Sequence, residues 1–225
     1  MMNDLVIIGS GGFGRELLAM LEDINREKKQ WNVIGFWNSD GHGEGEEVQG
    51  LKVLSKLELF EKKLPYFAFG LGFPEAKLKT LLAMPKEANF PSLVHPSVVR
   101  SSTASIGSRG VVITAGNILT VDLRIHDFAM LNLGCTVGHD SQVGAFSVLS
   151  PGVHLSGNVL LGEGVSVGTG ASIIPGKKVG AWSTIGAGAV VTTDVPPGST
   201  AVGVPAKVVK VRDVFPEVGT TGTNR

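Results

Sequence analysis

The sequence from Leu131 to Val167 reads LNLGCT-VGHDSQ-VGAFSV-LSPGVH-LSGNVL-LGEGVS-V, with an aliphatic residue at every sixth position. The same spacing holds over fourteen consecutive positions: Ile113, Leu119, Ile125, Leu131, Val137, Val143, Leu149, Leu155, Leu161, Val167, Ile173, Val179, Ile185 and Val191. A period of six fits neither an amphipathic helix nor the alternation of a half-buried strand. It indicates an architecture built from short repeated units.

Two further columns of residues accompany this aliphatic column. Glycine follows the aliphatic residue at Gly138, Gly144, Gly162, Gly168, Gly180 and Gly186, and small or apolar residues stand two positions before it at Cys135, Ser141, Val153, Val159, Ala171 and Ala189. Residues two apart share a strand face, and glycine relieves unusual backbone angles at a bend. Three such strands close a triangular coil, so we expect a left-handed parallel β-helix from about His95 to Val195. This fold is an exception to the usual right-handed crossover.

Three bulky residues, Phe128, Phe146 and Trp182, lie outside the aliphatic column. We expect them either to close an end of the prism or to pack against a neighbouring subunit. By analogy with other proteins built from hexapeptide repeats, we expect a trimer about an axis parallel to the prism.

The first 92 residues show a different pattern, in which expected strands and helices alternate. Strands are expected at Leu5 to Ile8, Val33 to Trp37 and Tyr66 to Phe69, and helices at Arg15 to Lys29, Ser55 to Lys62 and Pro74 to Met84. This order predicts a small Rossmann-like α/β domain with a parallel sheet. We therefore expect an α/β domain at 1–92, the β-helix domain at 93–212 and a C-terminal tail at 213–225.

A glycine-rich turn, Gly9-Ser10-Gly11-Gly12-Phe13-Gly14, joins the first expected strand to the first helix. Its backbone N–H groups and the helix N-terminus could approach a phosphate or a sugar. A dinucleotide site would place an acidic residue at the end of the second strand, where this chain has Trp37-Asn38-Ser39-Asp40. The turn therefore favours a mononucleotide or nucleotide-sugar site over NAD, with a purely structural turn as the alternative.

Composition and charge exclude several broad classes of protein. The 20 basic and 20 acidic residues balance, so the chain has no bulk attraction to nucleic acid or anionic lipid. The single cysteine, Cys135, cannot form an internal disulfide, and no apolar run is long enough for a membrane helix. The start of the sequence lacks a basic flank typical of signal peptides, so we expect a cytoplasmic protein without membrane insertion.

His139 is the histidine best suited to catalysis, because Asp140 follows it directly just past an expected bend. A neighbouring carboxylate fixes the imidazole tautomer and raises its basicity, as a general base requires. The alternative is a surface histidine without a chemical role. A zinc site is the rival, but His126, His139 and His154 are spaced by 13 and 15 residues and fall at different phases of the repeat. We expect no metal.

The order of motifs resembles the sialic-acid O-acetyltransferase family, which includes the N-acetyltransferases of UDP-linked bacillosamine and GDP-linked perosamine. The resemblance rests on Gly9-Ser-Gly-Gly-Phe-Gly14, Gly35-Phe-Trp-Asn-Ser39, Asn132-Leu-Gly-Cys-Thr-Val-Gly-His-Asp140, Leu155-Ser-Gly-Asn158 and Gly203-Val-Pro-Ala-Lys207. It covers nearly the whole chain up to about Arg212.

The resemblance implies a homotrimer with a nucleotide-linked sugar on the N-terminal domain and acetyl-CoA in a groove between adjacent prisms. By this resemblance His139 is the general base and Asp140 raises its basicity. The implied sugar-nucleotide contacts are Ser10, Gly11 and Gly12, with Asn38 and Ser39 beside the base, and the implied acetyl-CoA contacts are Gly157, Thr169 and Ala187.

Three positions depart from the family pattern. The family often has histidine at Phe13 and two aspartates at Asn38 and Ser39, so the sugar and the nucleotide base are not assigned from sequence. The bacillosamine enzymes have a histidine near the thioester where this chain has Val148. This departure removes one side-chain contact to acetyl-CoA that the resemblance would otherwise imply, and it leaves the general base in place.

The sequence thus predicts an acetyl-CoA-dependent N-acetyltransferase acting on a nucleotide-linked amino sugar, of 4-amino-4,6-dideoxy type, in the biosynthesis of a surface polysaccharide such as lipopolysaccharide or of another glycan. Direct transfer is expected, because Cys135 points inward in the repeat and is unsuited to a covalent acyl intermediate. The alternatives are a sugar O-acetyltransferase of sialic-acid type and a non-catalytic trimeric scaffold that binds a nucleotide.

Overall fold

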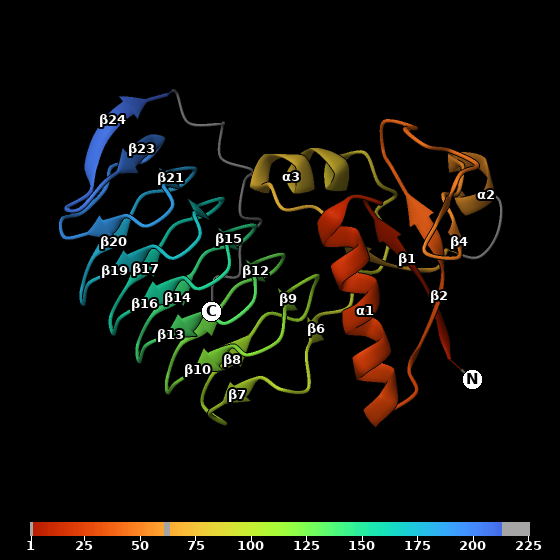
Figure 1. Ribbon diagram of the computed structural model, residues 1–225, viewed down its shortest axis with the longest axis horizontal. Helices are drawn as coiled ribbons and strands as arrows, with labels where there is room; N and C mark the ends of the chain where they lie inside the picture. The colour runs from red at the N-terminus through yellow and green to blue at the C-terminus, as the bar shows by residue number, and fades with distance from the viewer. Residues whose placement is uncertain (1, 61–63, 213–225) are drawn as a thin grey trace.

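The computed structural model describes residues 2–60 and 64–212, and the tail expected at 213–225 lies outside this part of the chain. The chain forms an α/β domain followed by a left-handed parallel β-helix (Figure 1). The N-terminal elements are β1 (Asn3–Ile8), α1 (Gly12–Glu27), β2 (Trp31–Trp37), β3 (Glu47–Val48), β4 (Leu51–Lys52), α2 (Lys56–Phe60), β5 (Tyr66–Phe69) and α3 (Pro74–Leu82). None of the helices in these residues is both long and apolar enough to cross a membrane.

The N-terminal sheet is parallel, in the order β2-β1-β5, as the alternation of strands and helices predicted. Leucines and isoleucines spaced three or four residues apart, such as Leu17, Leu21 and Ile24, give α1 one buried face. This face packs on one side of the sheet, and α3 lies over the other side. The carboxyl ends of β1, β2 and β5 therefore meet at one edge of the sheet.

The β-helix consists of three parallel sheets whose strands follow one another in turn along the chain. Sheet I contains β6 (Leu93–Val94), β9 (Val112–Ile113), β12 (Met130–Leu131), β15 (Val148–Leu149), β18 (Ser166–Val167), β21 (Thr184–Ile185), β23 (Ser199–Val202) and the antiparallel β24 (Lys207–Val211). Sheet II contains β7 (Val99–Arg100), β10 (Ile118–Leu119), β13 (Thr136–Val137), β16 (His154–Leu155), β19 (Ser172–Ile173) and β22 (Val190–Val191). Sheet III contains β8 (Ser105–Ile106), β11 (Arg124–Ile125), β14 (Gln142–Val143), β17 (Leu160–Leu161) and β20 (Lys178–Val179).

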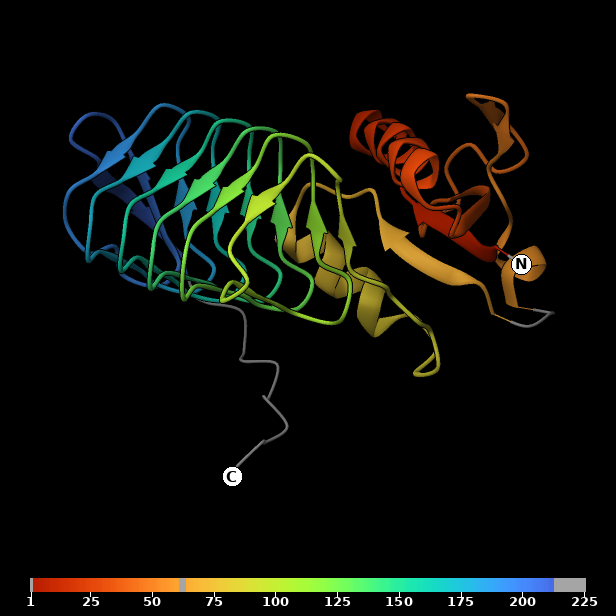
Figure 2. The ribbon, with the colours of Figure 1, turned by 90° about the horizontal axis from the view of Figure 1, so that it is seen from below.

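Paired strands are one coil apart, as the register of Thr136 with His154 shows. All fourteen residues of the aliphatic column are at most 2% exposed, and the small column two residues earlier is at most 1% exposed. Both columns therefore fill the prism, as expected from the repeat. Figure 2 shows the stacked coils and the N-terminal domain against their first turns.

The three corners of the prism are named by the sheets they join: the I/II, II/III and III/I corners. The sequence predicted glycine at these corners but gave the wrong reason for the column at Gly138, Gly144 and Gly162, because none of these three has a left-handed backbone. A Cβ atom on Gly138 would lie 2.6 Å from the backbone nitrogen of Gly157, and one on Gly144 would lie 2.3 Å from the carbonyl oxygen of Gly162. Close approach of the next coil therefore excludes a side chain at both positions.

The expectation for Phe128, Phe146 and Trp182 was also wrong. These three residues line the III/I corner and are buried against the aromatic side chains and α3 of the same chain's N-terminal domain. The Phe128 and Phe146 rings stack with centroids 5.0 Å apart, and the Phe90 ring meets Phe128 edge-on at 5.6 Å. The bulky column thus attaches the N-terminal domain to the prism.

Sheet I forms the second part of this attachment. Val112, Met130 and Val148 point out of the prism from sheet I and pack with the buried face of α1. The N-terminal domain therefore covers β9, β12 and β15 of sheet I and the III/I corner from Phe128 to Trp182. The II/III corner lies opposite sheet I in the triangular cross-section, on the far side of the prism from this domain.

Candidate functional site

The first part of the candidate site is the glycine-rich turn between β1 and α1. A Cβ on Gly14 would lie 1.9 Å from the carbonyl oxygen of Gly9, and Gly9 itself has φ +103° and touches the loop after β5. By contrast, Gly11 and Gly12 are exposed and have open space where a Cβ would be. The first turn of α1 has neither a side-chain cap nor an acidic residue. Its N–H groups can therefore meet an anion such as a phosphate.

Asn38, at the end of β2, holds this turn in place. Its Oδ1 accepts the backbone N–H of Ser10 at 3.0 Å, while its Nδ2 donates to Ser10 Oγ at 2.8 Å and to the carbonyl of His42 at 2.7 Å. Both hydrogens of the amide are therefore used inside the protein. Ser39 lies beside α3, with its Oγ 3.4 Å from Thr80 Oγ1. The structure thus brings Ser10, Asn38 and the open Gly11-Gly12 turn together at one sheet edge.

The second part is the His139–Asp140 pair, which lies at the II/III corner between β13 and β14. His139 Nδ1 is 2.8 Å from Asp140 Oδ2, and the two side chains are 57% and 54% exposed. A neutral imidazole that donates its Nδ1 hydrogen to the carboxylate has an unprotonated Nε2, which can accept a proton. Asp140 has a left-handed φ of +59°.

Gly157 lies one coil above and supports the imidazole. A Cβ on Gly157 would be 2.3 Å from His139 Nε2, so the ring packs directly on the glycine backbone. The backbone N–H of Asn158 donates to the carbonyl of His139 at 2.8 Å. The Gly157 N–H itself has no hydrogen-bond partner among the described residues. An imidazole nitrogen that can accept a proton and an unused backbone donor therefore lie side by side.

The other two predicted acetyl-CoA contacts, Thr169 and Ala187, lie elsewhere on the prism. Both are exposed at the I/II corner, across sheet II from His139. Their backbone N–H groups also lack partners within the part of the chain that is described, whereas the carbonyl of Thr169 accepts from Gly188 N. Within one chain, Gly157 therefore lies at a different corner of the prism from Thr169 and Ala187.

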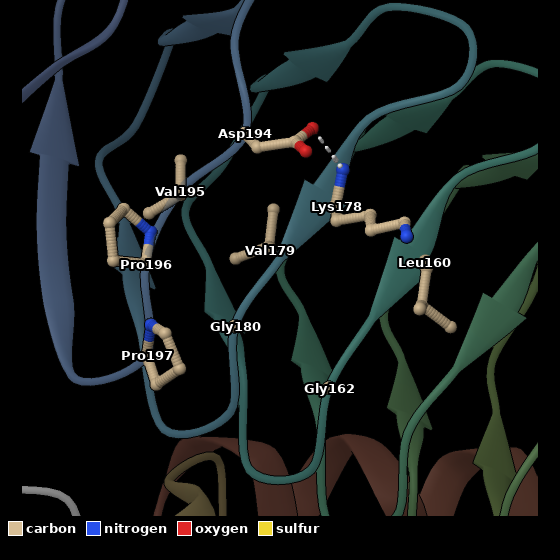
Figure 3. A pocket seen from close by; sticks show the side chains of 9 residues that line it. All are labelled: Leu160, Gly162, Lys178, Val179, Gly180, Asp194, Val195, Pro196 and Pro197. Carbon is tan, nitrogen blue, oxygen red and sulfur yellow. Dashed lines mark hydrogen bonds between the residues drawn. The ribbon is translucent and has the colours of Figure 1, made fainter.

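A shallow groove lies on sheet III near the C-terminal end of the prism (Figure 3). Its volume is about 430 Å³, and it is lined by Leu160, Gly162, Lys178, Val179, Gly180, Asp194, Val195, Pro196 and Pro197. Asp194 Oδ1 accepts the backbone N–H of Lys178 at 2.9 Å, and the Lys178 side chain extends toward Leu160. The groove is mainly apolar with one cation at its rim. It borders the II/III corner on the C-terminal side of His139.

Cys135 is fully buried in the prism, where its Sγ lies 3.1 Å from the carbonyl of Asn132 and 3.2 Å from that of Ser150. Burial raises the pKa of its thiol to about 11, so a thiolate nucleophile is disfavoured. Val148 is 2% exposed and is covered by the α1 contact of its own chain.

The three histidines considered for zinc occupy three different places. His126 lies at the III/I corner, His139 at the II/III corner and His154 on sheet II, where its Nδ1 is 2.9 Å from Thr136 Oγ1. Among the residues that the structure describes, no group of three or more His, Cys, Asp or Glu side chains is placed to hold a metal ion.

Lys77 in α3 is a residue that the sequence did not single out. Its side chain is 1% exposed, and its Nζ donates to the carbonyl of Phe128 at 2.6 Å. A lysine on a surface helix ordinarily points to solvent, so its burial follows only from the way the prism covers α3. No local sequence signal could have identified it.

Comparison with known proteins finds relatives over nearly the whole chain. Residues 4–81 match the profile of the PglD N-terminal domain. The chain is 32% identical to the acetyltransferase domain of PglB from Neisseria gonorrhoeae, over 92% of this chain and 100% of that one, with a TM-score of 0.79. That domain has also been solved with acetyl coenzyme A.

A second set of structures comes from Caulobacter crescentus. PerB, solved with CoA and GDP-perosamine, is 31% identical over 93% of this chain and 99% of its own length, with a TM-score of 0.81. An asparagine-for-histidine variant of the perosamine N-acetyltransferase, solved with the same two ligands, is 30% identical over 93% and 98%, with a TM-score of 0.82.

Proposed function

Because this chain belongs to the hexapeptide-repeat nucleotide-amino-sugar N-acetyltransferases and is an acetyl-CoA-dependent acyltransferase, we propose that it acetylates the amino group of a nucleotide-linked 4-amino-4,6-dideoxy sugar with His139 as general base. Residues 1–92 would supply the sugar-nucleotide site and residues 93–212 the acetyl-transfer prism. We place the reaction in the cytoplasm and in the biosynthesis of a surface glycan. The His139–Asp140 pair packed on Gly157 carries this proposal.

The arrangement of His139 and Gly157 supports direct transfer. The sugar amine attacks the thioester carbonyl carbon, and its proton passes to His139 Nε2 as the new C–N bond forms. The carbonyl oxygen becomes an oxyanion, which the partner-free N–H of Gly157 can stabilise. The C–S bond then breaks, and the proton on His139 passes to the departing CoA thiolate. The products are the acetamido sugar and CoA, without an acyl-enzyme.

The positions of the two half-sites favour an active site shared between copies. The sugar-nucleotide turn belongs to a domain that covers the first strands of sheet I, whereas His139 lies at the opposite corner of the prism. In a trimer, the II/III corner of one prism can face the I/II corner and the N-terminal domain of the next. His139 and Gly157 of one copy would then meet Thr169, Ala187 and the sugar nucleotide of its neighbour.

The groove on sheet III supports the placement of acetyl-CoA along the II/III corner. It begins on the C-terminal side of His139 and combines apolar walls with the Lys178 ammonium at the rim. With the thioester at Gly157, the adenosine and phosphate end of the cofactor would extend toward this groove. The unpartnered N–H groups of Gly157, Thr169 and Ala187 would bond carbonyl groups of the cofactor.

Substitution of His139 tests the proposed role directly. His139→Asn removes the basic nitrogen from a half-exposed side chain, so the fold should persist while kcat falls by about 10²- to 10⁴-fold. Turnover is measured by CoA release, with a panel of UDP-, GDP- and dTDP-linked amino sugars, and the trimer by light scattering. His126→Asn, at an exposed histidine on the III/I corner, serves as a control and should keep the wild-type kcat. Wild-type turnover in a folded His139→Asn trimer would remove His139 from the mechanism.

The same panel, extended to hydroxy sugars with and without a nucleotide, separates N- from O-acetylation. The perosamine enzyme is an N-acetyltransferase, which favours the amine as acceptor. The non-catalytic scaffold predicted as an alternative is wrong, since the chain belongs to a family of acetyltransferases.

A further inference from the structure

Lys77 is buried at the contact between α3 and the prism. Its Nζ donates to the carbonyl of Phe128 at 2.6 Å, and no acidic side chain pairs with it in the described part of the chain. Burial lowers the pKa of Lys77 to about 7. Burying an ammonium group with a single carbonyl partner lowers the stability of the folded state, because the group loses its hydration. A methionine of similar shape would fill the same space without this loss.

A second polar contact attaches α3 at a different height of the prism. Glu75 pairs with Arg212, which also donates to the carbonyl of Trp182 at 3.1 Å. Phe128 and Trp182 occupy equivalent positions at the III/I corner, three coils apart, which is about 14 Å at the usual strand spacing. Two attachment points at different heights fix the angle of a helix as well as its position.

The same helix touches the proposed sugar-nucleotide site. Thr80 lies three residues after Lys77 and therefore on the same side of α3. Its Oγ1 is 3.4 Å from Ser39 Oγ, next to Asn38 and the Ser10 turn. The loop before α3 packs on the turn as well, because Gly70 O and Leu71 Cδ2 lie against Gly9. Helix α3 thus connects the turn to the prism.

We propose that Lys77 is a positioning residue, which sets the orientation of the sugar-nucleotide site relative to the prism so that the sugar amine meets the thioester. This role rests on the proposed function. It differs from general stabilisation, because an apolar residue could fill the same space but could not hold the Phe128 carbonyl. Misplacement of a reacting group by about 1 Å is enough to slow a reaction about 10²-fold.

The variant Lys77→Met tests this role, with Lys79→Met as a matched control on the exposed side of the same helix. Lys77→Met should form a stable trimer and bind nucleotide sugar and CoA with unchanged Kd by calorimetry. Its kcat should fall by about 10- to 100-fold. Lys77→Arg keeps a donor and should retain more activity than Lys77→Met, whereas Lys79→Met should match the wild type. A folded Lys77→Met enzyme with wild-type kcat would overturn the proposal.

A second variant covers the case in which Lys77→Met does not fold. Glu75→Gln breaks the other attachment at a partly exposed pair and should also lower kcat without changing either Kd. Full kcat in Glu75→Gln would contradict the two-point attachment on which the positioning role depends.

Hydrogen exchange gives a readout that does not depend on activity. Peptides covering α3 should exchange faster in Lys77→Met than in Lys79→Met. If the wild type were inactive on every amino sugar while Lys77→Met still exchanged faster in α3, the proposed function would be refuted. The attachment of α3 by Lys77 would remain supported. Unchanged exchange would refute the attachment itself.

Discussion

Gly157 determines where the His139 ring can lie. A Cβ at this position would be 2.3 Å from His139 Nε2. The backbone of Gly157 is not left-handed, so an alanine there would not strain the main chain and would clash only with the imidazole. We expect Gly157→Ala to displace the imidazole and lower kcat about 10²-fold, with little change in thermal stability. Steady-state kinetics and a melting curve measure the two effects.

Gly116→Ala is the control, because we expect it to lower stability and leave kcat unchanged. Gly116 has φ +74° and only ordinary contacts at its Cβ position, so alanine there should cost about 1 kcal/mol of stability through backbone strain. Its kcat should remain at the wild-type value. Equal kinetics in Gly157→Ala and Gly116→Ala would show that the imidazole does not depend on Gly157.

Lys77 makes stability depend on pH in a predictable direction. Its pKa is about 7 in the folded protein and near 10.5 when unfolded, so the unfolded chain binds more protons between these values. Relative to Lys77→Met, the wild type should therefore gain stability as the pH rises from 7 to 10, by up to about 1.4 kcal/mol per pH unit.

Urea unfolding at pH 6, 8 and 10 measures this difference. Arg109, Glu75 and Arg212 are charged groups at the same contact, and their contributions cancel because they are present in both proteins. A difference that stays constant across the three pH values would mean that Lys77 does not titrate in this window.

The sequence predicted some of these residues and not others for a physical reason. His139 and Asp140 are neighbours in the chain, so their pairing needed no knowledge of the fold. Asn38 was expected beside the nucleotide base, and the structure adds that both hydrogens of its amide hold Ser10 and the His42 loop. Lys77 is buried only because a prism starting at Leu93 covers its helix, and that contact is not encoded locally.

At the scale of elements, the six-residue period was sufficient to predict the prism. One column of aliphatic residues determines which side chains face inward, and three flat strands per coil follow from it. The glycine column was located correctly, but its cause is the distance to the next coil rather than a left-handed backbone. The sequence pattern shows at which positions a side chain is excluded. The atoms that exclude it belong to the next coil and are known only from the folded structure.

The aromatic column at the III/I corner should control how firmly the N-terminal domain is attached. Phe146 is buried and its ring stacks on Phe128 at 5.0 Å, so Phe146→Ala should lower stability by about 3–5 kcal/mol. Hydrogen exchange should accelerate in α3 and β5 and remain slow in the coils after β18. Uniform acceleration throughout the prism would contradict a local role for this column.

At the scale of the whole molecule, the two half-sites proposed for one chain, the Ser10 turn and His139, lie on opposite sides of its prism. A mixture of two inactive proteins tests whether neighbouring copies share a site. One variant is His139→Asn. The other is Gly12→Asp, which introduces a carboxylate where the α1 N-terminus would meet a phosphate and where the structure has open space.

In the proposed trimeric assembly, equal amounts of these variants reassembled together should recover about one quarter of wild-type activity, because a site is intact when one copy supplies His139 and the next supplies Gly12. Each variant alone, reassembled in the same way, is the control. If each chain used its own His139 and its own turn, the mixture would remain as inactive as its components.

The tight spacing of the coils at Gly138 and Gly144 also restricts how such a protein can change in length. A whole coil of 18 residues preserves all three sheets, as the pairing of Thr136 with His154 shows. A single extra residue is accommodated only at a corner, as between Ile106 and Ile113, where paired strands lie 19 residues apart and the aliphatic column still faces inward. Each added coil lengthens the prism by about 4.8 Å without altering the corners already present. The length of the prism, and with it the span available to a bound cofactor, can therefore increase only by whole coils.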